Sequence, residues 1–225
     1  MNYEGLLELV QKRRSIRKFK PEPIPDEYVN QIIEAARWAP SGANSQPWEF
    51  IVVKKQDLRD KIIELIEEER PISHKMETAR EPEFRFRWRP AGYVRAPVFI
   101  ILCGDTRTKD VYPVSTTMIM GSSIFTSSLA SAFLYMNLAV TALGLGSQWV
   151  TAAAHPFEQS MIKELLGIPK ELEIYDMMAL GYPAAEPRPR LVRAREEMVH
   201  YDGYDKSKSR TEQQVKDFIV TLRSR

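Results

Sequence analysis

Residues 111–157 read VYPVSTTMIMGSSIFTSSLASAFLYMNLAVTALGLGSQWVTAAAHPF and contain no Asp, Glu, Lys or Arg, although 28% of the 225-residue chain is charged. A bilayer span needs about 20 predominantly apolar residues, but the most apolar part of this run, 129–145, is interrupted by serine, asparagine, threonine and glycine. A helix that is apolar nearly all round can instead form the buried centre of a soluble protein. The run therefore predicts a long buried helix near 122–143, ended by Gly144 and Gly146, and no membrane partner.

The overall composition excludes several other classes of protein. The 32 Lys and Arg residues nearly balance the 30 Asp and Glu residues, which argues against a protein that wraps DNA and against an acidic disordered tail. The first five residues lack the pattern of a secretory signal, and the single cysteine, Cys103, allows no internal disulfide, so we expect a cytoplasmic location. The three histidines are far apart and lack the spacing of a metal site.

Apolar periodicity and turn residues predict the elements on either side of the uncharged run. We expect strands at 49–53, 97–102, 147–151 and 174–180, and no internal repeat. Strands separated by helices indicate a layered α/β or α+β domain, and residues 71–95 have no regular pattern. The expected flanking helices lie at 26–39, 56–69, 157–166 and 211–222.

Two polar motifs are candidates for binding an anionic, heterocyclic cofactor. Residues 13–17, Arg-Arg-Ser-Ile-Arg, combine guanidinium groups that can grip a phosphate with a hydroxyl donor, although a solvated basic helix end would look the same. In residues 40–48, Ser41, Asn44 and Gln46 can match the donors and acceptors of a ring edge, although the same residues are common in turns. Residues 144–149 do not form a Rossmann fingerprint, because Trp149 stands at the third glycine position.

Residues 83–89 alternate aromatic side chains with arginines. In an extended conformation the two kinds of side chain lie on opposite faces. Such a segment can cover a flat ligand, contact a partner, or stack on single-stranded nucleic acid. The candidates for a substrate lid are Phe84, Arg85, Phe86, Arg87 and Trp88.

Taken together, these motifs resemble the nitroreductase family of FMN-dependent oxidoreductases. The resemblance rests on residues 13–17, 39–48 and 137–146, and on Gly181-Tyr182-Pro183 followed by a basic patch and residues 197–200. It covers nearly the whole chain, with the motifs in the family's order.

The resemblance implies an α+β, three-layer fold, with a central mixed sheet flanked by helices, in an intertwined homodimer that holds FMN at its interface. It implies one domain over 1–225, with 71–95 as a lid or insert and 204–225 as a C-terminal extension. NAD(P)H would deliver hydride to FMN, and a nitroaromatic, quinone or related small aromatic acceptor would then take it in a ping-pong cycle. No metal is implied.

The family's roles carry over to particular residues of this chain. Arg13 and Ser15 would hold the phosphate and ribityl chain, and Arg17 would approach the flavin N1/O2 edge, where a cation favours the reduced anion. Thr151 would lie near N5, and Pro40 would reach the neighbouring subunit's flavin. The residues implied to contact the cofactor are Arg13, Arg14, Ser15, Arg17, Pro40, Ser41, Asn44, Trp149, Val150, Thr151 and Arg193, with Arg190 or Arg195 as alternatives to Arg193.

Other functions stay open at this point. Residues 40–43 and the acidic helix end at 67–69 also resemble the iodotyrosine deiodinase branch of the superfamily, which would imply reductive dehalogenation. An oxygen-dependent, flavin-cleaving branch is a further enzyme alternative. The non-enzyme alternative is single-stranded nucleic-acid binding through residues 83–95, which predicts salt-sensitive binding, although the small net charge argues against it.

Overall fold

A computed structural model describes residues 2–80, 91–187 and 189–223 of the chain. The lid candidates at 84–88 lie outside the described residues. The chain divides into two compact units, Met1–Pro187 and Arg188–Arg225, which are described separately below. The unit boundary lies upstream of the extension predicted at 204–225, and the assignment of 1–225 to one domain stays a prediction.

The first unit is built on a four-stranded sheet with the order β1-β2-β4-β3. The strands β1 (Trp48–Val53), β2 (Val98–Asp105), β3 (Gly146–Val150) and β4 (Leu172–Gly181) lie where the sequence predicts them. All three strand pairs are antiparallel. The predicted mixed sheet therefore needs correction, because in the described residues the parallel pairing is a single bridge between Ser15 and Ser147.

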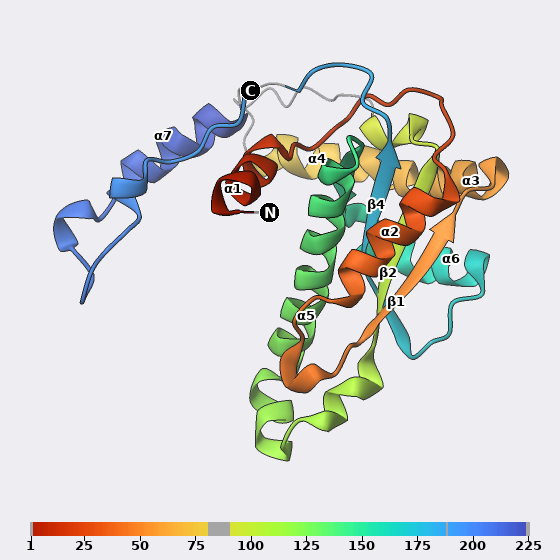
Figure 1. Cartoon of the computed structure of the whole chain (residues 1–225), viewed down its shortest axis with the longest axis horizontal. Coiled ribbons are helices and arrows are strands. Elements are labelled where there is room, and N and C mark those ends of the chain that lie inside the picture. The colour runs from red at the N-terminus through yellow and green to blue at the C-terminus, as the bar shows by residue number, and fades with distance from the viewer. Residues whose placement is uncertain (1, 81–90, 188, 224–225) are drawn as a thin grey trace. The chain divides into compact units, whose positions relative to one another are not determined.

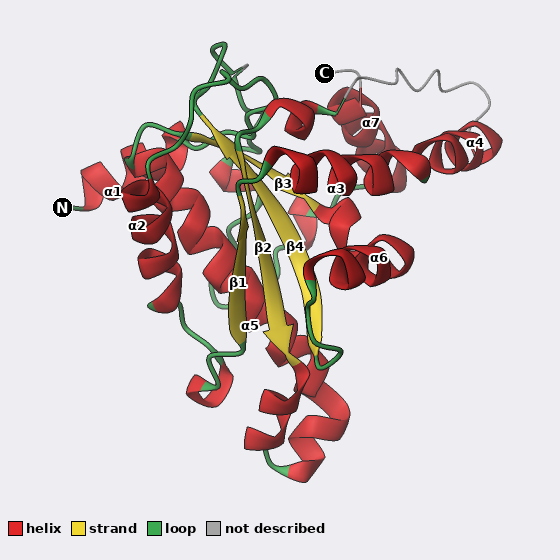
Figure 2. Cartoon of the chain, turned by 90° about the vertical axis from the view of Figure 1, so that its right-hand side faces the viewer, coloured by secondary structure: helices red, strands yellow, loops and turns green. Residues whose placement is uncertain are grey.

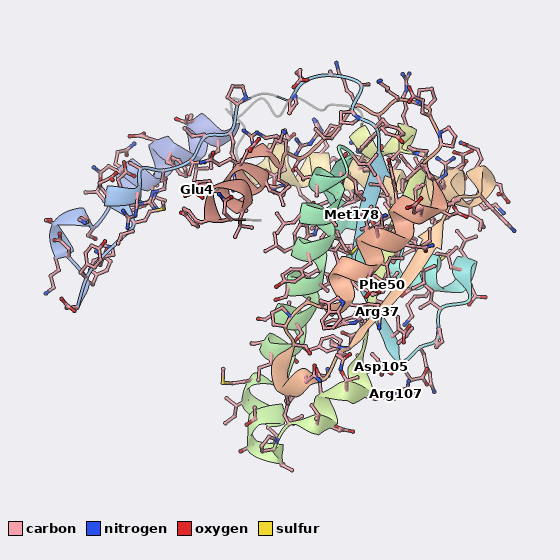
Figure 3. The ribbon with its side chains drawn as sticks, in the orientation of Figure 1. Glu4, Arg37, Phe50, Asp105, Arg107 and Met178 are labelled. Carbon is pink, nitrogen blue, oxygen red and sulfur yellow. The ribbon has the colours of Figure 1, made fainter. Side chains whose placement is uncertain are left out.

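Helices cover both faces of the sheet, so the fold has three layers, as Figure 2 shows. The helices α3 (Gln56–Glu68) and α6 (Pro156–Leu166) pack on one face, and α2 (Asp26–Arg37) and α5 (Val114–Ala142) on the other. The central strand β2 is buried on both sides, so its sequence VFIILCG is continuously apolar. Phe50 and Met178, labelled in Figure 3, belong to the core on the α2/α5 face. The predicted α+β, three-layer architecture is confirmed.

The long helix α5 runs the length of the sheet (Figure 1) and begins eight residues earlier than predicted, directly after Pro113. It ends as predicted at Gly144, which adopts φ +70°, a conformation that costs glycine little. The Leu145 amide then donates to the Val140 carbonyl at 2.9 Å, which closes a Schellman-type turn. By length and composition α5 is also long and apolar enough to cross a membrane, but 44% of its most apolar window is buried inside the protein.

Two helices in the first unit were not predicted. The helix α1 (Tyr3–Lys12) is capped by the Asn2 side chain and has no buried residue. The helix α4 (Arg70–Arg80) also has no buried residue and lies in the segment 71–95, for which no regular structure was expected. The helix α1 does carry apolar residues at helical spacing, Tyr3, Leu6, Leu7 and Val10, which the sequence prediction overlooked. In α4, Pro71 is tolerated because it lies in the first turn of the helix.

The second unit consists of an irregular segment followed by the helix α7 (Glu212–Arg223). This helix lies within one residue of the range predicted for it, 211–222. Two short 3₁₀ turns precede it, Arg195–Glu197 and Lys206–Lys208.

Candidate functional site

The arginine motif at 13–17 lies along the outer edge of β3. Ser15 forms a parallel bridge with Ser147, and the Ile16 amide donates to the Ser147 carbonyl at 2.8 Å. Since parallel strands advance together, this register places Arg17 level with Trp149. Residues 13–17 and 147–151 are therefore neighbours in the fold, although they are about 130 residues apart in sequence. Both segments belong to the cofactor site that the family resemblance implies.

Gly92 confirms this arrangement by a very close approach to both segments. A Cβ atom on Gly92 would lie 2.5 Å from Arg17 Cβ and 2.6 Å from Gln148 Oε1, so any other residue would push the two segments apart. Among the described residues, Gln148 Oε1 is the buried side-chain polar atom without a hydrogen-bond partner. Gly92 and Gln148 are absent from the predicted site, and only the structure reveals their position beside Arg17.

Trp149 is held by a carboxylate that the sequence prediction missed. Its indole Nε1 donates to Asp176 Oδ2 at 2.5 Å, and its ring lies 4.1 Å from the Phe133 ring, centroid to centroid. Asp176 is only 6% exposed, and this burial raises the pKa of its carboxyl to about 6, against the opposing effect of the Trp149 hydrogen bond. Trp149 itself keeps 38% of its surface exposed, so one face of the ring is accessible.

The second motif, at 40–46, lies against the middle of α5. The Gly42 amide donates to Ser128 Oγ at 3.1 Å, and the Gln46 amide donates to Ser41 Oγ at 3.0 Å. Ala43, Asn44 and Gln46 all adopt positive φ, between 43° and 53°. Left-handed backbone at non-glycine residues is strained, and such strain is concentrated at functional sites.

Helix geometry shows that the two motifs are not brought together within one chain. The Ser147 hydroxyl is bonded to Asn137 near the C-terminal end of α5 at 2.9 Å, whereas Gly42 is bonded to Ser128. These two anchor residues are nine positions apart on the helix, which corresponds to about 14 Å at about 1.5 Å per residue. Arg13–Arg17 and Thr151 therefore form one group of predicted cofactor residues, and Pro40, Ser41 and Asn44 form another.

The remaining predicted cations have partners within the protein. Arg14 donates to the Arg13 carbonyl at 2.9 Å and, together with Lys12, lines a cavity of about 390 Å³. Arg193 belongs to the C-terminal unit, where its Nε lies 3.3 Å from Glu197 Oε2. The roles predicted for Arg193 and its alternatives Arg190 and Arg195 stay predictions.

The side chains at the β3 edge fit an anionic flavin nucleotide. Arginine guanidinium groups and the Ser15 hydroxyl are donors suited to phosphate. The buried acceptor Gln148 Oε1 lies in the same place, beside Arg17. The donor set and the accessible Trp149 ring together suit a ligand that is both flat and negatively charged.

A three-layer α+β fold with cations and an aromatic ring along its edge strand defines a class of nucleotide-cofactor oxidoreductases. The chain belongs to the nitroreductase family, whose family model matches residues 10–182.

Individual relatives agree with this family assignment. Iodotyrosine deiodinase 1 of Rattus norvegicus is 30% identical over 196 residues, which cover 82% of this chain and 64% of the rat protein. A putative NADH dehydrogenase/NAD(P)H nitroreductase of Methanothermobacter thermautotrophicus is 31% identical, and the match covers 81% of this chain and 79% of that protein. The chain thus spans less than two thirds of the rat protein's length.

Solved structures share the fold. An iodotyrosine deiodinase bound to FMN and 3-iodo-L-tyrosine has a TM-score of 0.69 and 27% identity, covering 88% of this chain and 100% of that chain. A BluB-like flavoprotein from Clostridium difficile 630 has a TM-score of 0.70 and 27% identity, covering 88% and 99% of the two chains. A nitroreductase from Bacteroides fragilis NCTC 9343, solved with bound FMN, has the same fold, with a TM-score of 0.67. The predicted family is confirmed by the family model, and two of these solved neighbours hold FMN, the predicted cofactor.

Proposed function

We propose that this oxidoreductase takes hydride from NAD(P)H and passes it to a nitroaromatic, quinone or related electron-poor acceptor in a ping-pong cycle. The observation that carries the proposal is the placement of Arg17 alongside residues 148–151, on the edge of β3. When bound there, FMN supplies the hydride chemistry, and the protein supplies orientation and charge.

Each group at the β3 edge then has a defined task. Arg13 and Ser15 would bind the phosphate and ribityl chain. Arg17 stabilises the negative charge that collects at the N1/O2 edge on reduction. Trp149 and Val150 lie beside the ring, and Thr151 lies near N5.

We further propose that the working unit is a homodimer, in which Pro40, Ser41 and Asn44 of one chain complete the site on the other. This arrangement would explain why the two motifs lie about 14 Å apart along α5 within one chain. It would also give a partner to the N-terminal half of α5, where Met118 and Ile119 are each 82% exposed. An apolar face of this kind on a soluble protein marks an interaction surface.

A reducing, cytoplasmic setting is part of the same proposal. Cys103, the single cysteine of the chain, is fully buried in β2. Its burial raises the pKa of the thiol to about 12, so the thiolate needed for oxidation or disulfide exchange is scarce at neutral pH.

The test is anaerobic stopped-flow spectroscopy of the purified flavoprotein. We expect flavin bleaching by NADH or NADPH, followed by reoxidation by a nitroaromatic and by a quinone. A colourless protein that cannot be reconstituted with FMN would contradict the cofactor assignment, and a flavin that neither nicotinamide reduces would contradict the proposed reaction.

A second candidate function is reductive dehalogenation, which is favoured by the 30% identity to rat iodotyrosine deiodinase 1. The same stopped-flow experiment distinguishes it, because reoxidation by a halotyrosine with release of halide would then exceed reoxidation by the quinone. The nucleic-acid alternative rests on residues 83–95, of which 83–90 lie outside the described residues.

A further inference from the structure

A cavity of about 340 Å³ opens next to the proposed flavin position, and the functional prediction does not use it. Arg70, Tyr93, Ala152, His155 and Glu158 are among the residues that line it. Its walls come from the α3–α4 junction, from the turn that follows Gly92, and from the start of α6. Most of these residues are polar, which is unusual for a gap between packed helices.

Two walls of the cavity continue directly into the β3-edge site. Tyr93 follows Gly92, the residue that packs against Arg17 and Gln148. Ala152 follows Thr151, the residue proposed to lie near flavin N5. One residue of the lining therefore follows a residue packed against Arg17, and another follows a residue proposed to contact the cofactor.

His155 is oriented in this cavity by a buried carboxylate. Its Nδ1 lies 2.5 Å from Glu158 Oε2, and the Glu158 side chain is 3% exposed whereas the His155 side chain is 58% exposed. With Nδ1 hydrogen-bonded to the carboxylate, Nε2 is the ring nitrogen that remains for a ligand. A carboxylate behind an imidazole fixes its tautomer and stabilises its cationic form.

The other titratable groups around the cavity are less suited to giving up a proton. Tyr93 donates to Glu67 Oε1 at 2.5 Å, and burial together with the Glu67 carboxylate raises the pKa of its phenol. Arg70 Nη1 lies 2.5 Å from the other oxygen of Glu67. Glu69 and Glu158 are the acidic groups of the lining. Imidazole is the group whose proton is exchanged readily near neutral pH.

We propose that this cavity receives the electron acceptor and that His155 is the general acid for its reduction. The inference rests on the proposed function. A quinone becomes a hydroquinone by gaining a hydride from the reduced cofactor at one oxygen and a proton at the other. That proton comes from Nε2 of the imidazolium, which leaves a neutral imidazole hydrogen-bonded to Glu158 and is reprotonated by solvent. Glu158 is a positioning residue in this scheme.

The experiment compares two oxidants of the photoreduced holoenzyme. Benzoquinone must gain protons, whereas ferricyanide gains only an electron. Removing a general acid costs about 100-fold or more, so we expect His155→Gln to slow reoxidation by benzoquinone by about that factor and to leave reoxidation by ferricyanide within about twofold of wild type. We expect a smaller loss, about tenfold, for Glu158→Gln, with the same insensitivity to ferricyanide. His74→Gln, which changes a histidine outside the lining, should match wild type with both oxidants.

A second measurement does not depend on turnover. Imidazole ¹⁵N shifts of the wild-type protein should show His155 protonated at Nδ1, and this signature should be lost in Glu158→Leu, which removes the acceptor that a glutamine would keep. An equal loss with both oxidants in His155→Gln, or no loss with either, overturns the assignment of His155. A wild-type protein that binds FMN but is not reduced by NAD(P)H overturns the proposed function itself.

Discussion

Residues 13–17 and residues 40–46 are both polar segments, yet different kinds of contact hold each of them in place. The first segment is bonded through its backbone to the edge of β3, the strand whose Trp149 is held by the buried carboxyl of Asp176. The second is a strained loop, held on the middle of α5 by Ser128 and by its own hydrogen bonds. We call the first the strand half-site and the second the loop half-site.

The difference teaches that motifs which define one site in the sequence need not meet within one chain. The strand half-site forms within one chain, and its geometry depends on the sheet. The loop half-site is anchored about 14 Å from it along α5, so in our proposal its function depends on a second subunit. The dependence on the sheet and the dependence on a second subunit can be tested separately, beginning with the largest expected effect.

The first prediction concerns the exposed surface of α5. Ile119→Glu should convert the dimer to a monomer and weaken FMN binding by more than about 100-fold, because an unpaired charge buried at an apolar interface costs about 3 kcal/mol or more. Light scattering and flavin fluorescence measure the two effects. Met161→Glu, at an exposed apolar position on α6, is the matched control and should change neither. A wild-type protein that is a folded monomer at micromolar concentration would contradict the dimer.

The second prediction tests directly whether the half-sites act across subunits. Arg17→Gln and Asn44→Ala should each weaken FMN binding, by about 10- to 100-fold for the loss of a charged hydrogen bond and by less for the neutral amide. A heterodimer of the two variants should then regain one site of wild-type affinity, since one of its two sites pairs the native Arg17 with the native Asn44.

If each flavin instead contacts both residues of the same chain, the heterodimer would regain no tight site. Titration of FMN into co-expressed, doubly tagged heterodimers measures the stoichiometry. Lys18→Gln, on the same segment as Arg17, is the control for a general loss of positive charge and should leave the affinity within about threefold of wild type, as expected of an exposed charge.

Much of the fold and of the candidate site can be predicted from the sequence. The elements and residues that were not predicted were missed for physical reasons. The four strands were predicted because their apolar runs are bounded by turn residues. The helix α1 was missed although the spacing of its apolar residues was a signal, and α4 was missed because its large apolar residues are only Ile72 and Met76. Asp176 left a signal that could have been used, since it is the single charge in the otherwise apolar strand stretch 174–180. The positive φ values at Ala43 and Gln46 left none, because neither residue type favours that conformation, whereas Asn44 is a residue that adopts it readily.

The third prediction concerns Asp176, the buried carboxyl that holds Trp149 in β3. Burial raises the pKa of Asp176 to about 6 from 3.8, so as pH rises from about 4 to 6 the unfolded chain ionises before the folded one and stability falls. Asp176→Asn removes this penalty and keeps an acceptor for Trp149. It should raise the free energy of unfolding by about 3 kcal/mol at pH 7.5 and hardly at all at pH 3.5.

Urea denaturation at fixed protein concentration and several pH values measures this effect. Asp105 is the matched control of opposite sign, because its hydrogen bonds to Arg107 lower the pKa of its carboxyl, and the two side chains lie together at the end of β2 (Figure 3). Asp105→Asn should therefore destabilise the protein at pH 7.5, and its effect should shrink as pH falls. If both variants shift stability in the same direction, the buried-charge explanation is wrong.

The smallest expected effect belongs to the backbone of the loop half-site. Ala43 adopts φ +50°, which costs an alanine about 1 kcal/mol or more relative to glycine, whereas glycine loses about 0.5–1 kcal/mol more entropy on folding. Ala43→Gly should therefore be neutral or stabilising by less than about 1 kcal/mol in thermal denaturation. Ala35→Gly, within α2, should be destabilising by about 1 kcal/mol. If Ala43→Gly lowers the free energy of unfolding as much as Ala35→Gly does, the loop is not strained. The two half-sites would then differ only in where they lie in the fold.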